Sequence, residues 1–205
     1  MYCKFIKSSI DFLLSLLGVI LLSPIFLCLC IWIKCDSKGP ILFKQKRIGK
    51  NKKYFYILKF RTMYIDTPKD MPTHMLKNPD QFITRSGKFL RKTSLDELPQ
   101  IINILKGEMS IIGPRPALWN QEDLIAERDK YNANDIKPGL TGWAQVNGRD
   151  ELEINVKAKL DGDYVEHMSF LFDVKCFVKT ITSVLKHDGV VEGGTGELKE
   201  KDVIT

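Results

Sequence analysis

The stretch that decides the fold is Phe12 to Ile33, FLLSLLGVILLSPIFLCLCIWI, which has no charged residue over 22 positions. An uncharged apolar run of this length is typical of a segment placed in a bilayer. Ser23-Pro24 lies at its middle. Because proline lacks a backbone donor and clashes with the carbonyl four residues earlier, we expect a kink or a break at mid-membrane.

Positive charge flanks the apolar run on both sides: Lys4 and Lys7 precede it, and Lys34, Lys38, Lys44, Lys46 and Arg47 follow it. Lysine and arginine near a membrane segment favour the cytoplasmic side. Two basic flanks therefore favour a re-entrant hairpin over residues 1–36, which turns at Ser23-Pro24 and leaves by the face it entered. A kinked single span is the alternative. A cleaved export signal is disfavoured because its small-residue cleavage site is missing, the first alanine being Ala117.

The rest of the chain predicts one domain, residues 37–188, followed by a polar tail, residues 189–205. The hydrophobic content of 44% is enough for a core, and the net charge is +6. Ten basic residues fall between Lys34 and Arg61, against the single acid Asp36. Next to a membrane segment, such a block indicates attraction to anionic lipids, at about 1 kcal/mol per basic residue. No nucleic-acid-binding signature accompanies the charge, so nucleic acid is not an expected partner.

We expect a mixed α/β domain that is mainly helical and has a small sheet. Residues 41–46 and 53–60 are predicted strands, joined across Gly49-Lys50-Asn51. Residues 64–85 form a long, proline-containing loop. Residues 172–185 predict an amphipathic helix, whose apolar face either packs in the core or lies in the lipid headgroup layer.

The segment Thr93-Ser94-Leu95-Asp96-Glu97-Leu98-Pro99-Gln100 predicts a helix start. Ser94 with Glu97 has the form of a capping box, Thr93 with Asp96 offers the alternative register, and Pro99 fits the first turn. Asp96 and Glu97 would then lie at a helix N-terminus, where anions are stabilised. A capped helix start with no chemistry is the alternative interpretation.

Four cations accompany this carboxylate pair: Lys59, Arg61, Arg91 and Arg115. Arginine contacts phosphate oxygens at two points, and Arg115 lies between two prolines that stiffen its loop. Carboxylates and arginines in a membrane-seated domain suggest phosphoryl chemistry with Mg²⁺ held by Asp96. The chain has no phosphate-binding glycine loop of the nucleoside triphosphatase type.

These residues stand in motifs that resemble those of the bacterial sugar transferase family, the monotopic polyprenyl-phosphate phosphoglycosyl transferases that begin surface glycan assembly. The matching segments are Lys59-Phe60-Arg61-Thr62-Met63, Ser94 to Gln100, Gly113-Pro114-Arg115-Pro116 and Pro138 to Arg149. Their order, their spacing and the preceding Ser23-Pro24 match over roughly residues 1–187. The chain resembles the small members, which consist of the catalytic unit alone.

The resemblance implies transfer of a sugar 1-phosphate from a UDP-sugar to undecaprenyl phosphate, with release of UMP and with Mg²⁺ as cofactor. Asp96 would be the nucleophile and would carry the sugar phosphate covalently, and Glu97 would assist the second half-reaction. The residues implied to bind substrate or phosphate are Lys59, Arg61, Arg91, Arg115, Gln145, Asn147 and Arg149.

The same resemblance implies a place on the cytoplasmic face of the bacterial inner membrane, among anionic lipids. Downstream glycosyltransferases would use the product for O-antigen, capsule, exopolysaccharide or glycoprotein glycans. The sequence does not identify the sugar. A non-catalytic membrane adaptor that binds anionic lipid through residues 34–61 is the alternative function.

Overall fold

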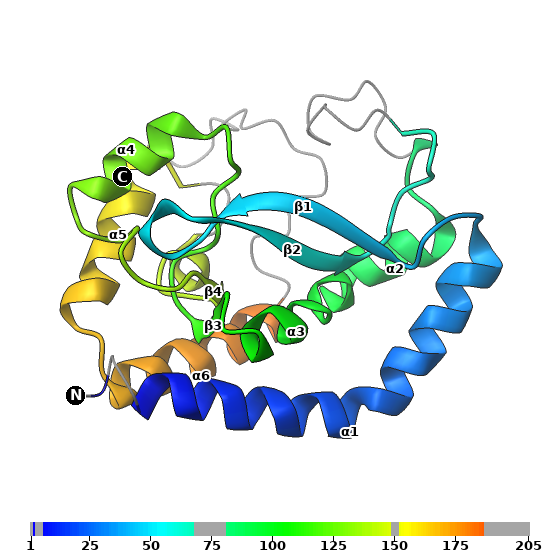
Figure 1. The fold of residues 1–205 in the computed structure, drawn as a ribbon, viewed down its shortest axis with the longest axis horizontal. Coiled ribbons are helices and arrows are strands. Elements are labelled where there is room, and N and C mark those ends of the chain that lie inside the picture. The colour runs from blue at the N-terminus through cyan, green and yellow to red at the C-terminus, as the bar shows by residue number, and fades with distance from the viewer. Residues whose placement is uncertain (1, 3–5, 68–80, 149–151, 187–205) are drawn as a thin grey trace, which may run out of the picture.

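The computed structural model describes residues 2, 6–67, 81–148 and 152–186. The predicted polar tail and Arg149 lie outside these ranges. Six helices and four strands are labelled in Figure 1: α1 (Lys7–Asp36), β1 (Leu42–Ile48), β2 (Tyr54–Phe60), α2 (Arg85–Lys92), α3 (Gln100–Leu105), β3 (Ser110–Ile112), α4 (Glu122–Asp129), β4 (Gly139–Thr141), α5 (Ile154–Glu166) and α6 (Phe170–Lys186). Single 3₁₀ turns occur at Lys50–Lys52, Leu95–Glu97 and Gln145–Asn147. The described part is thus mainly helical with little sheet, as the sequence predicts.

Helix α1 contains Pro24 and is assigned as one helix of 30 residues. It runs along the base of the molecule, and its second half rises away from that line (Figure 1). Pro24 cannot donate to the carbonyl of Ile20, and the hydroxyl of Ser23 donates to that carbonyl instead, at 2.8 Å. The Ser-Pro pair therefore bends the helix without leaving this acceptor unpaired.

Most of the apolar surface of α1 is exposed, including Leu13, Ile20, Leu21 and Leu27, each more than 60% accessible. Among the described residues it is the one helix long and apolar enough to cross a membrane. A buried polar stripe opposes this surface. Lys7 forms an ion pair with Asp173 of α6 at 2.6 Å, and Asp11 accepts hydrogen bonds from Ser110 at 2.7 Å and from the Ile111 amide at 3.1 Å. These contacts attach the start of α1 to α6 and β3.

Strands β1 and β2 form an antiparallel hairpin in which Leu42 pairs with Phe60 and Ile48 with Tyr54. The prediction of two strands is confirmed, with β1 extending two residues beyond the predicted end. Helix α3 lies between this hairpin and α1 (Figure 1). Phe55 and Ile57 are buried with Ile104 of α3, which covers one face of the sheet.

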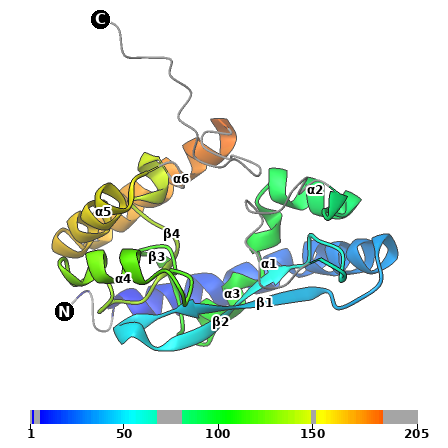
Figure 2. The ribbon, with the colours of Figure 1, turned by 90° about the horizontal axis from the view of Figure 1, so that it is seen from above.

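The other end of the molecule is built on β3 and β4, a parallel pair with Ser110 opposite Gly139 and Ile112 opposite Thr141. Helices α4, α5 and α6 gather at this end, whereas α2 lies at the opposite end of the β1–β2 hairpin (Figure 2). Tyr164 of α5 and Cys176 of α6 are buried against Ile112. Segments far apart in sequence thus meet around the short parallel pair.

Helix α6 confirms the predicted amphipathic helix, but its apolar face does not form core. Asp173 and Cys176 are on the buried side of the helix. The exposed side carries Phe170, Leu171, Val174, Phe177, Val178 and Ile181, with exposures from 42% to 78%. Of the two alternatives that the sequence left open, core packing is therefore wrong for this face.

Candidate active site

The centre of the site is a cluster of two carboxylates and two cations. The Nζ atom of Lys59 lies 2.8 Å from Oε1 of Glu97 and 3.8 Å from Oδ2 of Asp96. The Nη2 atom of Arg115 lies 2.9 Å from the same Glu97 oxygen. The structure therefore brings together four of the residues that the sequence singled out, from three separate segments of the chain.

Packing between β2 and α3 brings the first three of these residues together. Asn103 of α3 is fully buried, and its side chain accepts from the Leu58 amide at 3.0 Å and donates to the Tyr56 carbonyl at 2.8 Å. These two bonds lie on either side of residue 57, so they fix α3 against the free edge of β2. Asp96 and Glu97 precede α3 by a few residues and Lys59 follows Leu58, so the same contact aligns carboxylates and lysine.

The local structure around Asp96 differs from the prediction. Ser94 has a left-handed backbone with φ of 56° and its side chain makes no cap hydrogen bond, and the Thr93 hydroxyl donates to the Phe89 carbonyl at 2.8 Å. Both capping registers are therefore wrong. The reason is that Thr93 and Ser94 end α2, where a left-handed residue commonly follows the last helical turn.

Asp96 and Glu97 consequently lie in a 3₁₀ turn, Leu95–Glu97, and α3 begins only at Gln100. The Glu97 amide is already used, since it donates to the Ser94 carbonyl at 3.2 Å. The expectation that a helix N-terminus stabilises these anions is therefore wrong. Neighbouring cations take that role.

The two carboxyls have opposite electrostatic environments. Burial raises the pKa of Asp96, and the negative charge of Glu97 adds to this effect, against the opposing attraction of Lys59 and the arginines. Burial also disfavours the charge of Glu97, but Arg115 and Lys59, through charge and hydrogen bonds, outweigh it and lower its pKa. Glu97 is thus held as an ion by its partners, while Asp96 is the weaker acid of the pair.

The loop Gly113-Pro114-Arg115-Pro116 presents the arginine of this cluster. The Gly113 amide donates to the Thr141 carbonyl at 2.8 Å, and the Gly139 amide donates to the Pro114 carbonyl at 2.8 Å. Backbone of Gly139 lies so close to Gly113 that an added Cβ on either glycine would approach backbone atoms to within 3.0 Å. The glycines and prolines of two separate motifs therefore form one rigid support for Arg115.

Arg91 and Arg61 differ in their relation to the carboxylate cluster. Arg91, on α2, donates through Nε to the Thr62 hydroxyl at 2.9 Å, and its charge acts on Asp96. The guanidinium of Arg61 instead binds the end of α1, donating to the carbonyls of Lys38 at 2.6 Å and Ser37 at 2.7 Å. Arg61 is buried there, so the structure does not bring it into the carboxylate cluster.

Gln145 and Asn147 lie in the 3₁₀ turn beyond β4, beside α6. Gln145 is buried, and neither polar atom of its side chain has a hydrogen-bond partner in the described residues. Asn147 donates to the Trp143 carbonyl at 2.7 Å and accepts from Lys179 at 3.3 Å. In the described part of the chain, no hydrogen bond or ion pair joins either residue to Asp96 or Glu97.

The carboxylates fit the way proteins hold Mg²⁺ beside phosphates. The described residues contain no cluster of three or more carboxylate, histidine or cysteine ligands. Mg²⁺, however, is usually bound through one or two carboxylates together with oxygens of a phosphate substrate. Asp96 keeps a raised pKa despite three nearby cations, so an added divalent charge would favour its ionised form.

Sequence reasoning missed several residues that position this site. Asp36, at the end of α1, accepts hydrogen bonds from the amide of Ser86 at 2.9 Å and from its hydroxyl at 2.8 Å, at the start of α2. Together with Arg61, it fixes the end of the apolar helix to two elements that carry Lys59 and Arg91. A signal was available, because Asp36 is the only acid among ten basic residues.

The chain is similar in sequence to a known protein family and to several of its members. The family model described as bacterial sugar transferase matches residues 2–187. An uncharacterised sugar transferase of Bacillus subtilis is 40% identical over 180 residues, covering 87% of this chain and 84% of that protein. A UDP-glucose:undecaprenyl-phosphate glucose-1-phosphate transferase of Escherichia coli is 38% identical over 185 residues, covering 87% of this chain.

An undecaprenyl-phosphate galactose phosphotransferase of Salmonella typhimurium is 33% identical over 201 residues, covering 91% of this chain. The aligned part is 40% of the Escherichia coli protein and 42% of the Salmonella protein. The chain thus spans less than half the length of these two relatives, and most of the length of the Bacillus protein.

Proposed function

The chain belongs to the bacterial sugar transferase family, and from this premise we propose that it transfers a sugar 1-phosphate from a UDP-sugar to undecaprenyl phosphate. The relatives named for such reactions act on glucose, galactose or N-acetylgalactosamine donors. The observation that carries the proposal is the cluster of Asp96, Glu97, Lys59 and Arg115. It offers one carboxylate for attack and two cations to receive phosphate oxygens.

In the first half-reaction, an Oδ atom of Asp96 attacks the β-phosphorus of the donor. The bond from that phosphorus to the bridging oxygen breaks, UMP leaves with the electron pair, and the sugar phosphate becomes an acyl phosphate on Asp96. Arg115, Lys59 and Arg91 would balance the charge of the phosphates. Mg²⁺, held by Asp96 and substrate oxygens, would supply further neutralisation of the diphosphate.

In the second half-reaction, a phosphate oxygen of undecaprenyl phosphate attacks the same phosphorus and releases the Asp96 carboxylate. The product is undecaprenyl diphosphate sugar. Glu97 is a poor base while Lys59 and Arg115 lower its pKa. Substrate phosphates would draw Lys59 and Arg115 away from Glu97 and so weaken the attraction that lowers its pKa. Substrate binding would therefore raise the pKa of Glu97 and allow it to take a proton.

The exposed apolar surfaces favour seating in a membrane. Both α1 and α6 carry an exposed apolar face, and the two helices are joined at the N-terminal end of α1, where Lys7 pairs with Asp173. We propose a re-entrant α1 that turns at Ser23-Pro24 and keeps the domain on the cytoplasmic face of the inner membrane, beside anionic lipids. The lipid substrate then reaches the site by moving within a plane, which reduces the search for a productive encounter.

The test of the reaction is the identity of the released nucleotide. Purified protein incubated with a panel of UDP-sugars, undecaprenyl phosphate and Mg²⁺ should release UMP and form a lipid-linked product. Release of UDP would indicate ordinary glycosyl transfer. Chelation of Mg²⁺ should stop the reaction and its return should restore it, since the carboxylate and the diphosphate alone leave excess negative charge.

Asp96→Asn tests the nucleophile, with Lys130→Gln, at the exposed residue that follows α4, as a matched control for purification and folding. The Asn variant should form no covalent adduct with donor labelled in the sugar, and it should release no UMP. The control should do both at the wild-type rate. A wild-type protein that accumulates product without any adduct on residue 96 would contradict the covalent mechanism. Salt-sensitive binding to vesicles without turnover would instead favour the alternative function, a non-catalytic membrane adaptor.

A further inference from the structure

A buried ion pair lies behind the arginine of the active site. Arg128 of α4 contacts Asp161 of α5 through Nε at 2.8 Å and through Nη2 at 2.6 Å. The two side chains are 4% and 1% exposed. Neither residue lies in the four matching segments named above, and in the described structure no hydrogen bond or ion pair joins either of them to Asp96, Glu97 or Lys59.

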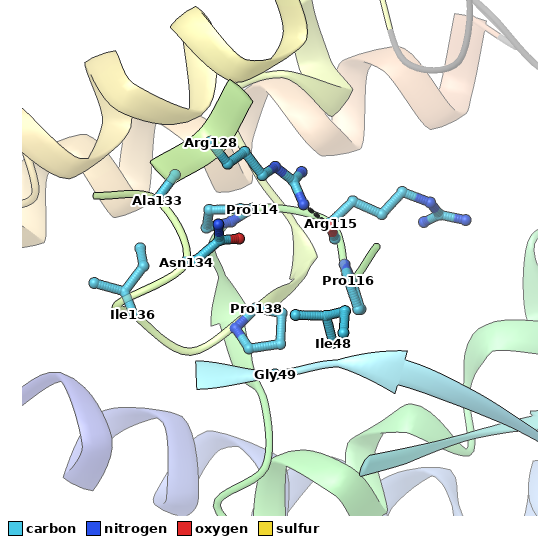
Figure 3. A pocket seen from close by; sticks show the side chains of 10 residues that line it. All are labelled: Ile48, Gly49, Pro114, Arg115, Pro116, Arg128, Ala133, Asn134, Ile136 and Pro138. Atoms are coloured by element: carbon cyan, nitrogen blue, oxygen red, sulfur yellow. Dashed lines mark hydrogen bonds between the residues drawn. The ribbon is translucent and has the colours of Figure 1, made fainter. Parts of the chain in front are cut away.

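The remaining nitrogen of Arg128 points at the loop of the active site. Its Nη1 donates to the carbonyl of Arg115 at 2.9 Å. In Figure 3 that carbonyl faces Arg128 while the side chain of Arg115 extends away from it. The side chain ends at Glu97, 2.9 Å from Nη2. Arg128 therefore holds the backbone of the residue whose side chain enters the cluster.

This support matters because of the loop's composition. Pro114 and Pro116 lack amide protons, so the orientation of the loop depends on donors to its carbonyls. Three consecutive carbonyls accept from outside: Pro114 from the Gly139 amide at 2.8 Å, Arg115 from Arg128 at 2.9 Å, and Pro116 from Arg47 at 3.0 Å. The donor to the central carbonyl is the side chain of Arg128, which is itself fixed by two contacts to Asp161.

Stability alone is a weak reason for such a pair. Replacing a buried ion pair by apolar residues of similar volume is often neutral or stabilising, because desolvation offsets the attraction. A shallow hollow of about 10 Å³ lies beside Arg128 and is also lined by Pro114, Pro116 and Asn134.

We propose that Arg128 and Asp161 are positioning residues that set the direction of Arg115 for its contact with donor phosphate. This inference rests on the proposed function and concerns the residues that support the backbone of the same site. The alternative is that the pair only joins α4 to α5. The proposal and the alternative differ in one respect. Only in the proposal does the Arg128–Asp161 pair affect the reaction through the side chain of Arg115.

The main test replaces the pair by apolar residues, Arg128→Met with Asp161→Leu, and measures kcat/KM for the UDP-sugar. A misdirected Arg115 should lower this value by roughly ten- to a hundredfold. In an Arg115→Lys background the same replacement should cost less than about twofold further, because the group it acts through is already altered. Equal losses in both backgrounds, or no loss in the first, would overturn the proposal.

Two further measurements keep the result decisive. Arg128→Lys serves where the double variant does not fold, since one ammonium group cannot bridge Asp161 and the Arg115 carbonyl as a guanidinium does. Amide hydrogen exchange over residues 113–118 should quicken in either variant, and it should stay unchanged in Lys130→Gln, at the C-cap of the same helix. This readout needs no turnover. Unchanged exchange in the variants overturns the inference, whereas absence of UMP release from the wild type refutes only the proposed function.

Discussion

Lys59 offers the sharpest view of how the site works, through the variant Lys59→Gln. Its Nζ atom is 3.8 Å from Oδ2 of Asp96, and the two side chains are 19% and 14% exposed. Two unit charges 4 Å apart attract by about 4 kcal/mol at an effective dielectric constant near 20 and by about 1 kcal/mol in water. These limits bracket the lost attraction, which corresponds to a factor of roughly 5 to 1000 in the ratio of ionised to protonated Asp96. The rate of UMP release at neutral pH should fall by up to this factor.

The pH dependence gives the sign of the effect. Asp96 must be ionised to attack, so kcat/KM falls as pH drops through the pKa of Asp96. Burial already raises that pKa, and Lys59 is the largest opposing influence. Removing the lysine charge therefore moves the acidic limb of the profile to higher pH.

The assay is UMP release as a function of pH, over the range in which the protein stays folded. Lys59→Arg keeps the charge and should keep the limb close to its wild-type position. Lys53→Gln, an exposed lysine on the same hairpin, serves as the surface control. A limb that stays in place in Lys59→Gln, or moves to lower pH, would refute the electrostatic coupling between Lys59 and the nucleophile.

Three further variants test separate parts of the structure. Asp96→Asn should raise the unfolding temperature at neutral pH, because the raised pKa of Asp96 means that its ionisation destabilises the folded state. Differential scanning fluorimetry should show that this gain vanishes below pH 3.8, the ordinary pKa of aspartate, where Asp96 is protonated in both states. Gly39→Ala should lower the unfolding temperature, since its Cβ would meet Nη1 of Arg61 at a φ of +125°, at a cost of roughly 1–3 kcal/mol. Ser23→Ala should lower the denaturant midpoint in micelles by the equivalent of roughly 1 kcal/mol, because the Ile20 carbonyl loses its donor, and Ser23→Thr should restore it. An unchanged unfolding transition in any of the three would contradict the contact concerned.

Much of the fold follows from local patterns that the sequence carries. The uncharged run of Phe12 to Ile33 is helical, the residues around Tyr54 to Phe60 form a strand, and the apolar and basic alternation near the end forms α6. Each pattern lies within a single element, so it needs no knowledge of a partner. The motifs likewise identified Lys59, Asp96, Glu97 and Arg115 before any contact was known.

The error came where one element ends and another must begin. Ser94 has the residue type of a cap, but the end of α2 sets its backbone, so the carboxylates lie in a 3₁₀ turn. The sequence also could not show that Arg61, which shares a motif with Lys59, binds the backbone that follows α1. Local sequence cannot decide between such roles, because the competing partner comes from a distant segment.

The sequence by itself determined the apolar helix, the strand hairpin and the set of charged residues available for chemistry. Only the tertiary structure decided that Lys59 and Arg115 share one oxygen of Glu97, and that Arg128 holds the loop behind them. The physical reason is that secondary structure depends on neighbours along the chain. The pKa of a carboxyl depends instead on charge and burial in space, which only packing supplies.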